Sequence, residues 1–131
     1  MSHFSRIKTK LSDGDLVEET LRELGLQFSR NNEKIRGWMG GTMTAEFRIT
    51  TGVSNYDVGL RRNGNAYEVV ADWSFVRGLS RDALVSDLNR TYALLGTKKM
   101  LDTQGFTLSK EVQQADGSTK LVLKKKEFVV S

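Results

Sequence analysis

Three successive segments in which apolar and polar residues alternate constrain the fold of this chain more than any other feature. They span residues 43–51, 56–62 and 67–73. Such alternation is typical of a strand with one buried face. Asn63-Gly64 separates the second segment from the third and supplies the positive φ angles of a tight hairpin turn. The sequence therefore predicts three neighbouring antiparallel strands. In the first, the residues expected to point inward are Met43, Ala45, Phe47 and Ile49.

Further strands and two helices flank this meander. Ser12 and Asp13 offer capping oxygens for a first helix, and Ser80 offers one for a second. The remaining predicted elements are a strand over 3–11, a helix from 12 to 25, a short strand at 26–28 before a turn at Asn31-Asn32, a loop over 36–41, a helix from 80 to 105, and a hairpin of 106–112 and 120–126. The order is β-α-β-β-β-β-α-β-β. We expect an α+β fold with two helices on one face of an antiparallel sheet, an extended ferredoxin-like sandwich.

Length and composition favour one globular domain over residues 1–131. A chain of 131 residues with 38% hydrophobic and 27% charged residues can bury a core without disulfides. Its apolar runs fall short of the roughly 20 residues that cross a membrane. The first residues lack the pattern of a secretory signal. We therefore expect no membrane insertion and no export.

The residue types that carry most enzyme chemistry are scarce. The chain has no cysteine, which excludes thiolate metal sites and a cysteine nucleophile, and His3 is its one histidine. We expect no catalytic residue, metal or cofactor, and hence no enzyme. A remote alternative is a paired-carboxylate site of Asp57, Glu68 and Asp72, which fall on neighbouring predicted strands. These acids could instead form cross-strand pairs with arginines such as Arg48 and Arg61.

Two tryptophans and a methionine are the candidate protein contacts. Trp38 and Met39 stand between Gly37 and Gly40-Gly41, so the loop could turn both side chains outward as apolar anchors. In the alternative reading, Trp38 folds back over the sheet edge. Trp73, at the end of the third alternating segment, is the further candidate.

Basic residues gather at both ends of the chain. Arg6, Lys8 and Lys10 share one face of the first strand, and Lys124, Lys125 and Lys126 follow one another near the C-terminus. They could orient a protein partner as a charged rim or bind nucleic acid. Base stacking, however, calls for exposed aromatic residues on the sheet, where acidic residues are expected here. Lysines on edge strands also prevent aggregation.

Several segments together resemble a known family. They are Met1-Ser2-His3-Phe4-Ser5 with Ile7-Lys8-Thr9, Tyr56-Asp57-Val58-Gly59-Leu60, Tyr67-Glu68-Val69-Val70-Ala71-Asp72-Trp73, Gln104-Gly105-Phe106-Thr107-Leu108, and Asp116-Gly117-Ser118 before Leu121-Val122-Leu123. The chain is similar over most of its length to the hypothetical chloroplast reading frame thirty-five family, a domain of unknown function of cyanobacteria and algal plastids. Similar proteins usually carry a second aromatic residue where this chain has Ser74.

The resemblance implies a photosynthetic host or a virus of one, and a location in a cyanobacterial cytoplasm or a chloroplast stroma. It brings no reaction or cofactor. Combined with the scarcity of catalytic residues, it predicts a non-enzymatic protein-binding, assembly or regulatory factor. The alternative is a nucleic-acid-binding module that uses its basic strand edges.

Overall fold

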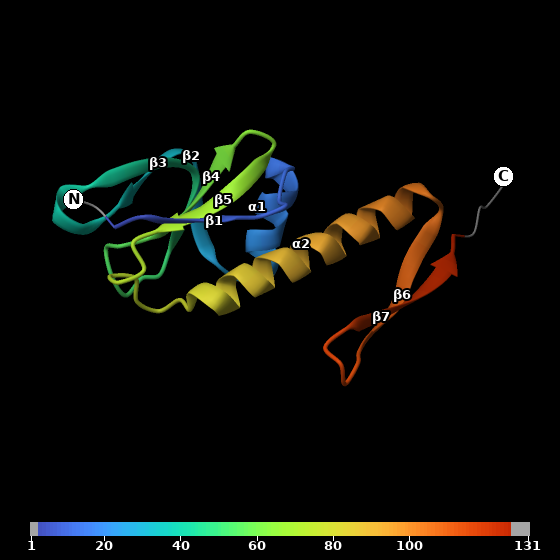
Figure 1. The fold of residues 1–131 in the computed structure, drawn as a ribbon. Coiled ribbons are helices and arrows are strands. Elements are labelled where there is room, and N and C mark those ends of the chain that lie inside the picture. The colour runs from blue at the N-terminus through green and yellow to red at the C-terminus, as the bar shows by residue number, and fades with distance from the viewer. Residues whose placement is uncertain (1–2, 127–131) are drawn as a thin grey trace. The chain divides into compact units, whose positions relative to one another are not determined.

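The computed structural model describes residues 3–126, and the chain divides into two compact units, residues 1–92 and 93–131 (Figure 1). Unit 1 contains β1 (Ser5–Lys8), α1 (Gly14–Glu23), β2 (Gln27–Arg36), the short 3-10 helix η1 (Trp38–Gly40), β3 (Thr42–Thr50), β4 (Val58–Asn63) and β5 (Ala66–Ala71). The helix α2 (Arg81–Thr103) begins in unit 1 and ends in unit 2, which also contains β6 (Phe106–Gln113) and β7 (Thr119–Lys125). The α+β class and the order of elements are confirmed. That residues 1–131 form a single domain stays a prediction.

The sheet of unit 1 has the strand order β1-β5-β4-β3-β2, and each neighbouring pair is antiparallel. The predicted meander is confirmed, and β1 joins it beside β5. Phe47, Leu60 and Val69 lie opposite one another in register and form the centre of the main core. Val17 and Leu21 of α1, with Leu84 and Leu88 of α2, pack into the same core. Both helices thus cover one face of the sheet.

The first helix begins where its sequence signal predicts. Asp13 is the N-cap, and its Oδ1 accepts hydrogen bonds from the amides of Asp15 (3.0 Å) and Leu16 (3.3 Å). Such caps typically contribute about 1 kcal/mol because they satisfy amides that have no partner within the helix. The cap fixes the start of α1 beside the sheet.

The turn predicted at Asn31-Asn32 is wrong. The two residues interrupt one long strand, β2, and both have positive φ angles, 106° and 47°. They form a β-bulge, after which pairing with β3 resumes at Glu33. A bulge bends a strand. Asparagine tolerates positive φ angles, which occur both in turns and in bulges. In this chain the two asparagines therefore bend a strand and do not end it.

Beyond this bend, the β2–β3 hairpin covers the second face of the sheet. Ile35 and Ala45 form a second buried cluster with Val70, whose side chain points away from the face of Val69. The hairpin passes over Gly59, where a Cβ atom would lie 2.6 Å from Ile35 Cγ1 and 3.0 Å from Ala45 Cβ. Only glycine leaves room for this contact.

Unit 2 is built differently. Its β6 and β7 pair only with each other in the described structure, in a hairpin with a bulge between Leu108 and Lys110. From Ala93 to Lys126, no described residue is buried. A two-stranded sheet offers too little surface to enclose a core. None of the described helices, α2 included, is long and apolar enough to cross a membrane.

Candidate protein-binding surface

The turn between β2 and β3, residues 37–41, forms a compact apolar tip. The amide of Gly37 donates to the carbonyl of Gly41 (2.7 Å), and the amide of Gly41 donates to the carbonyl of Trp38 (3.2 Å). Met39 has a φ of 56°, in the left-handed region that residues other than glycine rarely adopt. Its side chain is 71% exposed. The turn therefore exposes Met39 to solvent on a backbone that these two hydrogen bonds hold in place.

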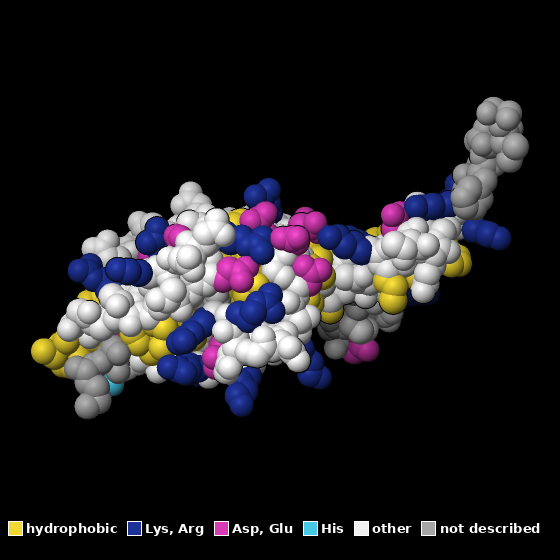
Figure 2. Space-filling model, turned by 90° about the horizontal axis from the view of Figure 1, so that it is seen from above, with side chains coloured by type: hydrophobic (Ala, Val, Ile, Leu, Met, Phe, Trp, Pro, Cys, Tyr) yellow, Lys and Arg dark blue, Asp and Glu magenta, His cyan; other side chains and the backbone are white. Residues whose placement is uncertain are grey.

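Trp38 is neither fully turned outward nor fully packed, the two alternatives considered from sequence. Its ring lies 5.6 Å from that of His3, centroid to centroid, and it is 38% exposed. Its amide donates to Oδ2 of Asp72 at 3.0 Å. Figure 2 shows the histidine side chain beside apolar side chains at one end of unit 1. Trp38 therefore lies against the N-terminal segment and still contributes to the exposed tip.

Asp72 anchors the tip to the end of β5. The residue is 1% exposed, and apart from the bond to Trp38 its carboxylate makes no described hydrogen bond, which leaves Oδ1 buried without a partner. A buried carboxylate with one hydrogen bond is energetically costly, so loss of the tip contact would leave it worse satisfied. No sequence pattern predicts this contact, because residues 38 and 72 meet only after the hairpin bends.

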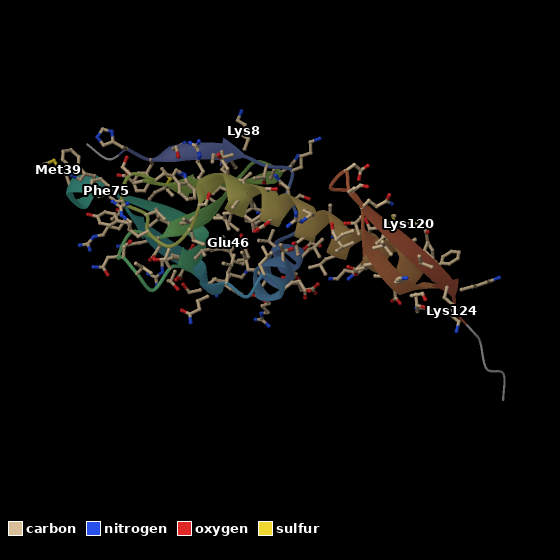
Figure 3. All side chains as sticks on the ribbon, turned by 90° about the horizontal axis from the view of Figure 1, so that it is seen from below. Lys8, Met39, Glu46, Phe75, Lys120 and Lys124 are labelled. Atoms are coloured by element: carbon tan, nitrogen blue, oxygen red, sulfur yellow. The ribbon has the colours of Figure 1, made fainter. Side chains whose placement is uncertain are left out.

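An aromatic pair adjoins the tip. The rings of Tyr56 and Phe75 stack with their centroids 5.0 Å apart, and the guanidinium of Arg36 lies 5.9 Å from the Tyr56 ring. The amide of Phe75 donates to the carbonyl of Asp72 at 3.0 Å. Figure 3 shows Met39 and Phe75 at the same end of unit 1. This pair was not expected from sequence, where Tyr56 began the predicted strand 56–62 and Phe75 followed the predicted strand 67–73.

Trp73, the third predicted apolar contact, is part of a different environment. It is half-buried and packs against the main core. Its indole Nε1 is buried and has no described hydrogen-bond partner. The structure thus brings Trp38 and Met39 together at the tip and places Trp73 beside the core.

The three candidate carboxylates have different surroundings. Asp57 lies 3.8 Å from Nε of Arg48, and burial raises the pKa of its carboxyl more than the arginine lowers it. Glu68 is buried on β5, where its register neighbours are Lys8 and Arg61. Asp72 holds the tip. Among residues 3–126, no group of three or more acidic or histidine side chains could hold a metal ion.

The predicted basic residues lie in both units. Arg6, Lys8 and Lys10 are exposed along the first strand and the residues that follow it, as their alternation predicted. Lys124 and Lys125 are exposed on β7 in unit 2. Lys126 instead donates from its Nζ to the Asp102 carbonyl at 3.1 Å. The tip and the C-terminal lysines therefore belong to separate units.

A polar network at the other end of the sheet was not expected from sequence. Arg30 binds Asp15 (Nη1–Oδ1 2.9 Å) and Glu46 (Nη2–Oε2 3.0 Å), and its guanidinium lies 4.9 Å from the Phe47 ring centroid. Burial and the neighbouring Glu46 raise the pKa of the Tyr67 hydroxyl. Because these charges are paired and stack on core rings, we interpret the network as a structural clamp between α1 and the sheet.

Comparison with known proteins agrees with the resemblance seen in the sequence. The family model described as protein of unknown function (DUF1257) matches residues 20–122. "Uncharacterized protein ycf35" of Guillardia theta is 32% identical over 126 residues, covering 95% of this chain and 98% of the relative. The protein of the same name from Pyropia yezoensis is 28% identical over the same shares. No solved structure matches. The chain therefore belongs to the DUF1257 family, and its resemblance to the hypothetical chloroplast reading frame thirty-five proteins is confirmed.

Proposed function

We propose that this chain is a non-enzymatic protein-binding factor that holds its partner with the Trp38–Met39 tip. The observation that carries the proposal is the exposed Met39 on a turn whose backbone is tied to the buried Asp72. Exposed apolar side chains on a preorganised backbone lose little conformational entropy on binding. Methionine and tryptophan are also enriched at protein interfaces. The setting we propose is a photosynthetic cell or its virus, in a chloroplast stroma or a cyanobacterial cytoplasm.

Arginine and aromatic side chains beside the tip support the same role. Arg36, Tyr56 and Phe75 provide a rim in which a cation and two rings are already in contact. Aromatic and arginine residues supply most of the strong contacts in protein interfaces. A partner that buries Met39 would meet this rim at the same end of the unit.

Site-specific crosslinking tests the proposal. A photoreactive amino acid replaces Met39, or Asn65 as the control, which is an exposed residue of the turn between β4 and β5 in unit 1. We expect position 39 to crosslink a defined protein in lysate of a photosynthetic host, and excess unlabelled chain to compete. Excess chain with Trp38→Ser and Met39→Ser should compete poorly. Crosslinking of the same proteins from positions 39 and 65 would contradict the assignment.

Nucleic-acid binding is the second candidate. The exposed row of Arg6, Lys8 and Lys10, together with Lys124 and Lys125, favours it. Binding of this kind weakens steeply with salt because the protein displaces counterions from the phosphates. Titration of fluorescent single-stranded RNA at several salt concentrations should then show a slope that flattens when Lys124 and Lys125 are replaced by serine. Absence of binding at low salt would exclude this candidate.

A further inference from the structure

Unit 2 leaves several apolar side chains partly exposed to solvent. Met100 is 53% exposed, and Val122 and Leu123 on β7 are 38% and 41% exposed. Leu101, Phe106 and Leu108 line a hollow of about 480 Å³ between the end of α2 and β6. Binding pockets commonly have a volume of roughly 300–1,000 Å³ and a mostly apolar lining. The hollow is therefore large enough to receive side chains of a partner.

The charges around this surface are mostly positive. Seven of the 20 basic residues but only four of the 16 acidic ones lie beyond Tyr92. Two of the described carboxylates already form ion pairs, Asp102 with Lys126 and Glu111 with Lys98. The third, Asp116, accepts hydrogen bonds from Ser118 in the hairpin turn. The charge left for a partner is therefore mainly positive.

Four lysines carry this charge. They are exposed, and among the described residues they form no ion pair: Lys110, Lys120, Lys124 and Lys125. Figure 3 shows Lys120 and Lys124 on the β6–β7 hairpin. Complementary charge on a partner must be negative, and it would orient that partner along the hairpin.

The hairpin also offers hydrogen bonds. In the described structure, β6 and β7 pair with each other alone, so each strand has an outer edge without a neighbouring strand. Such an edge accepts an extended segment through main-chain hydrogen bonds, while alternate side chains of that segment reach pockets on one face.

From these observations we propose that the β6–β7 hairpin and the end of α2 bind an extended segment of a partner protein in which acidic residues alternate with apolar ones. The acidic residues would face the four lysines, and the apolar ones would enter the hollow at Leu101, Phe106 and Leu108. A nucleic acid fits less well, because Phe106 is the only aromatic residue from Ala93 to Lys126 and base stacking needs several. This surface is separate from the tip, so either proposal can fail alone.

Peptide display on the immobilised full chain tests the proposal. We expect enrichment of peptides that combine Asp or Glu with Leu, Ile, Val or Phe. A synthetic peptide of the consensus should bind the full chain, and the affinity should fall about tenfold with Lys124→Glu and Lys125→Glu, both at exposed positions. Leu108→Ser should weaken binding through the hollow. Lys34→Glu, a charge reversal at an exposed position of β2 in unit 1, is the matched control and should leave the affinity unchanged.

Three outcomes would overturn the proposal. One is a selection without acidic peptides, and another is a consensus peptide whose affinity survives both charge reversals. The third is that no acidic peptide binds, while vesicles containing phosphatidylglycerol or single-stranded RNA bind through the same lysines. Circular dichroism of each variant checks that loss of binding does not come from loss of fold.

Discussion

Unit 1 and unit 2 both contain helical residues and antiparallel strands, yet among residues 3–126 every buried residue lies in unit 1. In unit 1 the sheet is covered on one face by helices and on the other by its own bent hairpin. In unit 2 a two-stranded hairpin and the end of α2 leave every described residue at least partly exposed. The contrast shows that alternation of apolar and polar residues can specify a strand, whereas burial of that strand also needs a helix or a second sheet layer packed against it. The stability of the folded chain should therefore come mainly from unit 1.

Matched leucine substitutions test this contrast with the largest expected effect. Leu60 is fully buried at the centre of the sheet, and Leu123 is 41% exposed on the hairpin. Leu60→Ala should lower the free energy of unfolding by about 2–5 kcal/mol because it opens a cavity, whereas Leu123→Ala should cost less than about 1 kcal/mol. Urea unfolding followed by far-ultraviolet circular dichroism measures both. Equal costs would show that unit 2 is packed as tightly as unit 1.

The covered second face of unit 1 depends on Gly59. Gly59→Ala should destabilise the chain by about 1–3 kcal/mol, because the new methyl group collides with Ile35 and Ala45. Ala45→Gly removes one of the two obstacles, so the double variant should lose less stability than the sum of the two single variants. Additive losses in the same urea titration would mean that the hairpin does not press on Gly59.

The anchor of the tip should have a smaller effect. Asp72→Ala removes the acceptor of the Trp38 amide and should cost about 1 kcal/mol, the net contribution of one hydrogen bond, whereas Asp72→Asn keeps an acceptor oxygen and should cost less. Amide hydrogen exchange at Trp38 and Met39 should accelerate in the alanine variant and much less in the asparagine variant. Unchanged exchange in Asp72→Ala would separate the tip from its proposed anchor.

The smallest effect should be an opposite pH dependence of two aspartates, one from each unit. Burial raises the pKa of Asp57 when the chain folds, so folding favours the protonated carboxyl. As pH rises and Asp57 ionises, this group therefore lowers the stability of the folded chain. Hydrogen bonds from Ser118 lower the pKa of Asp116, so its contribution is present at neutral pH and disappears in acid.

Asparagine variants measure this pair. Asp57→Asn should therefore raise stability at neutral pH relative to the wild type, with a gain that shrinks in acid. Asp116→Asn should lower it slightly at neutral pH and have no effect in acid. Thermal unfolding at neutral and acidic pH distinguishes the two variants. A shift of the same sign in both would contradict the assigned causes.

Sequence patterns could predict the elements of both units but not the contacts between distant parts. Alternation and the Asn63-Gly64 turn predicted the meander because they act over a few residues. The bend at Asn31-Asn32 was mistaken for a turn, since asparagine favours positive φ in both. Without that bend, neither the burial of Ile35 nor the bond between Trp38 and Asp72 could be foreseen. The glycines around Trp38 and Met39 allowed outward side chains at this turn but left open whether Trp38 would fold back over the sheet edge, and Met39 is the more exposed of the two.

Residue-resolved hydrogen exchange of the full chain tests the contrast between the units most directly. We predict slow exchange in β3, β4 and β5, where unfolding of the core is required, and fast exchange from Phe106 to Lys125. Addition of the selected acidic peptide should slow exchange in β6 and β7 and leave unit 1 unchanged. Equal protection in both units without a peptide would contradict the account.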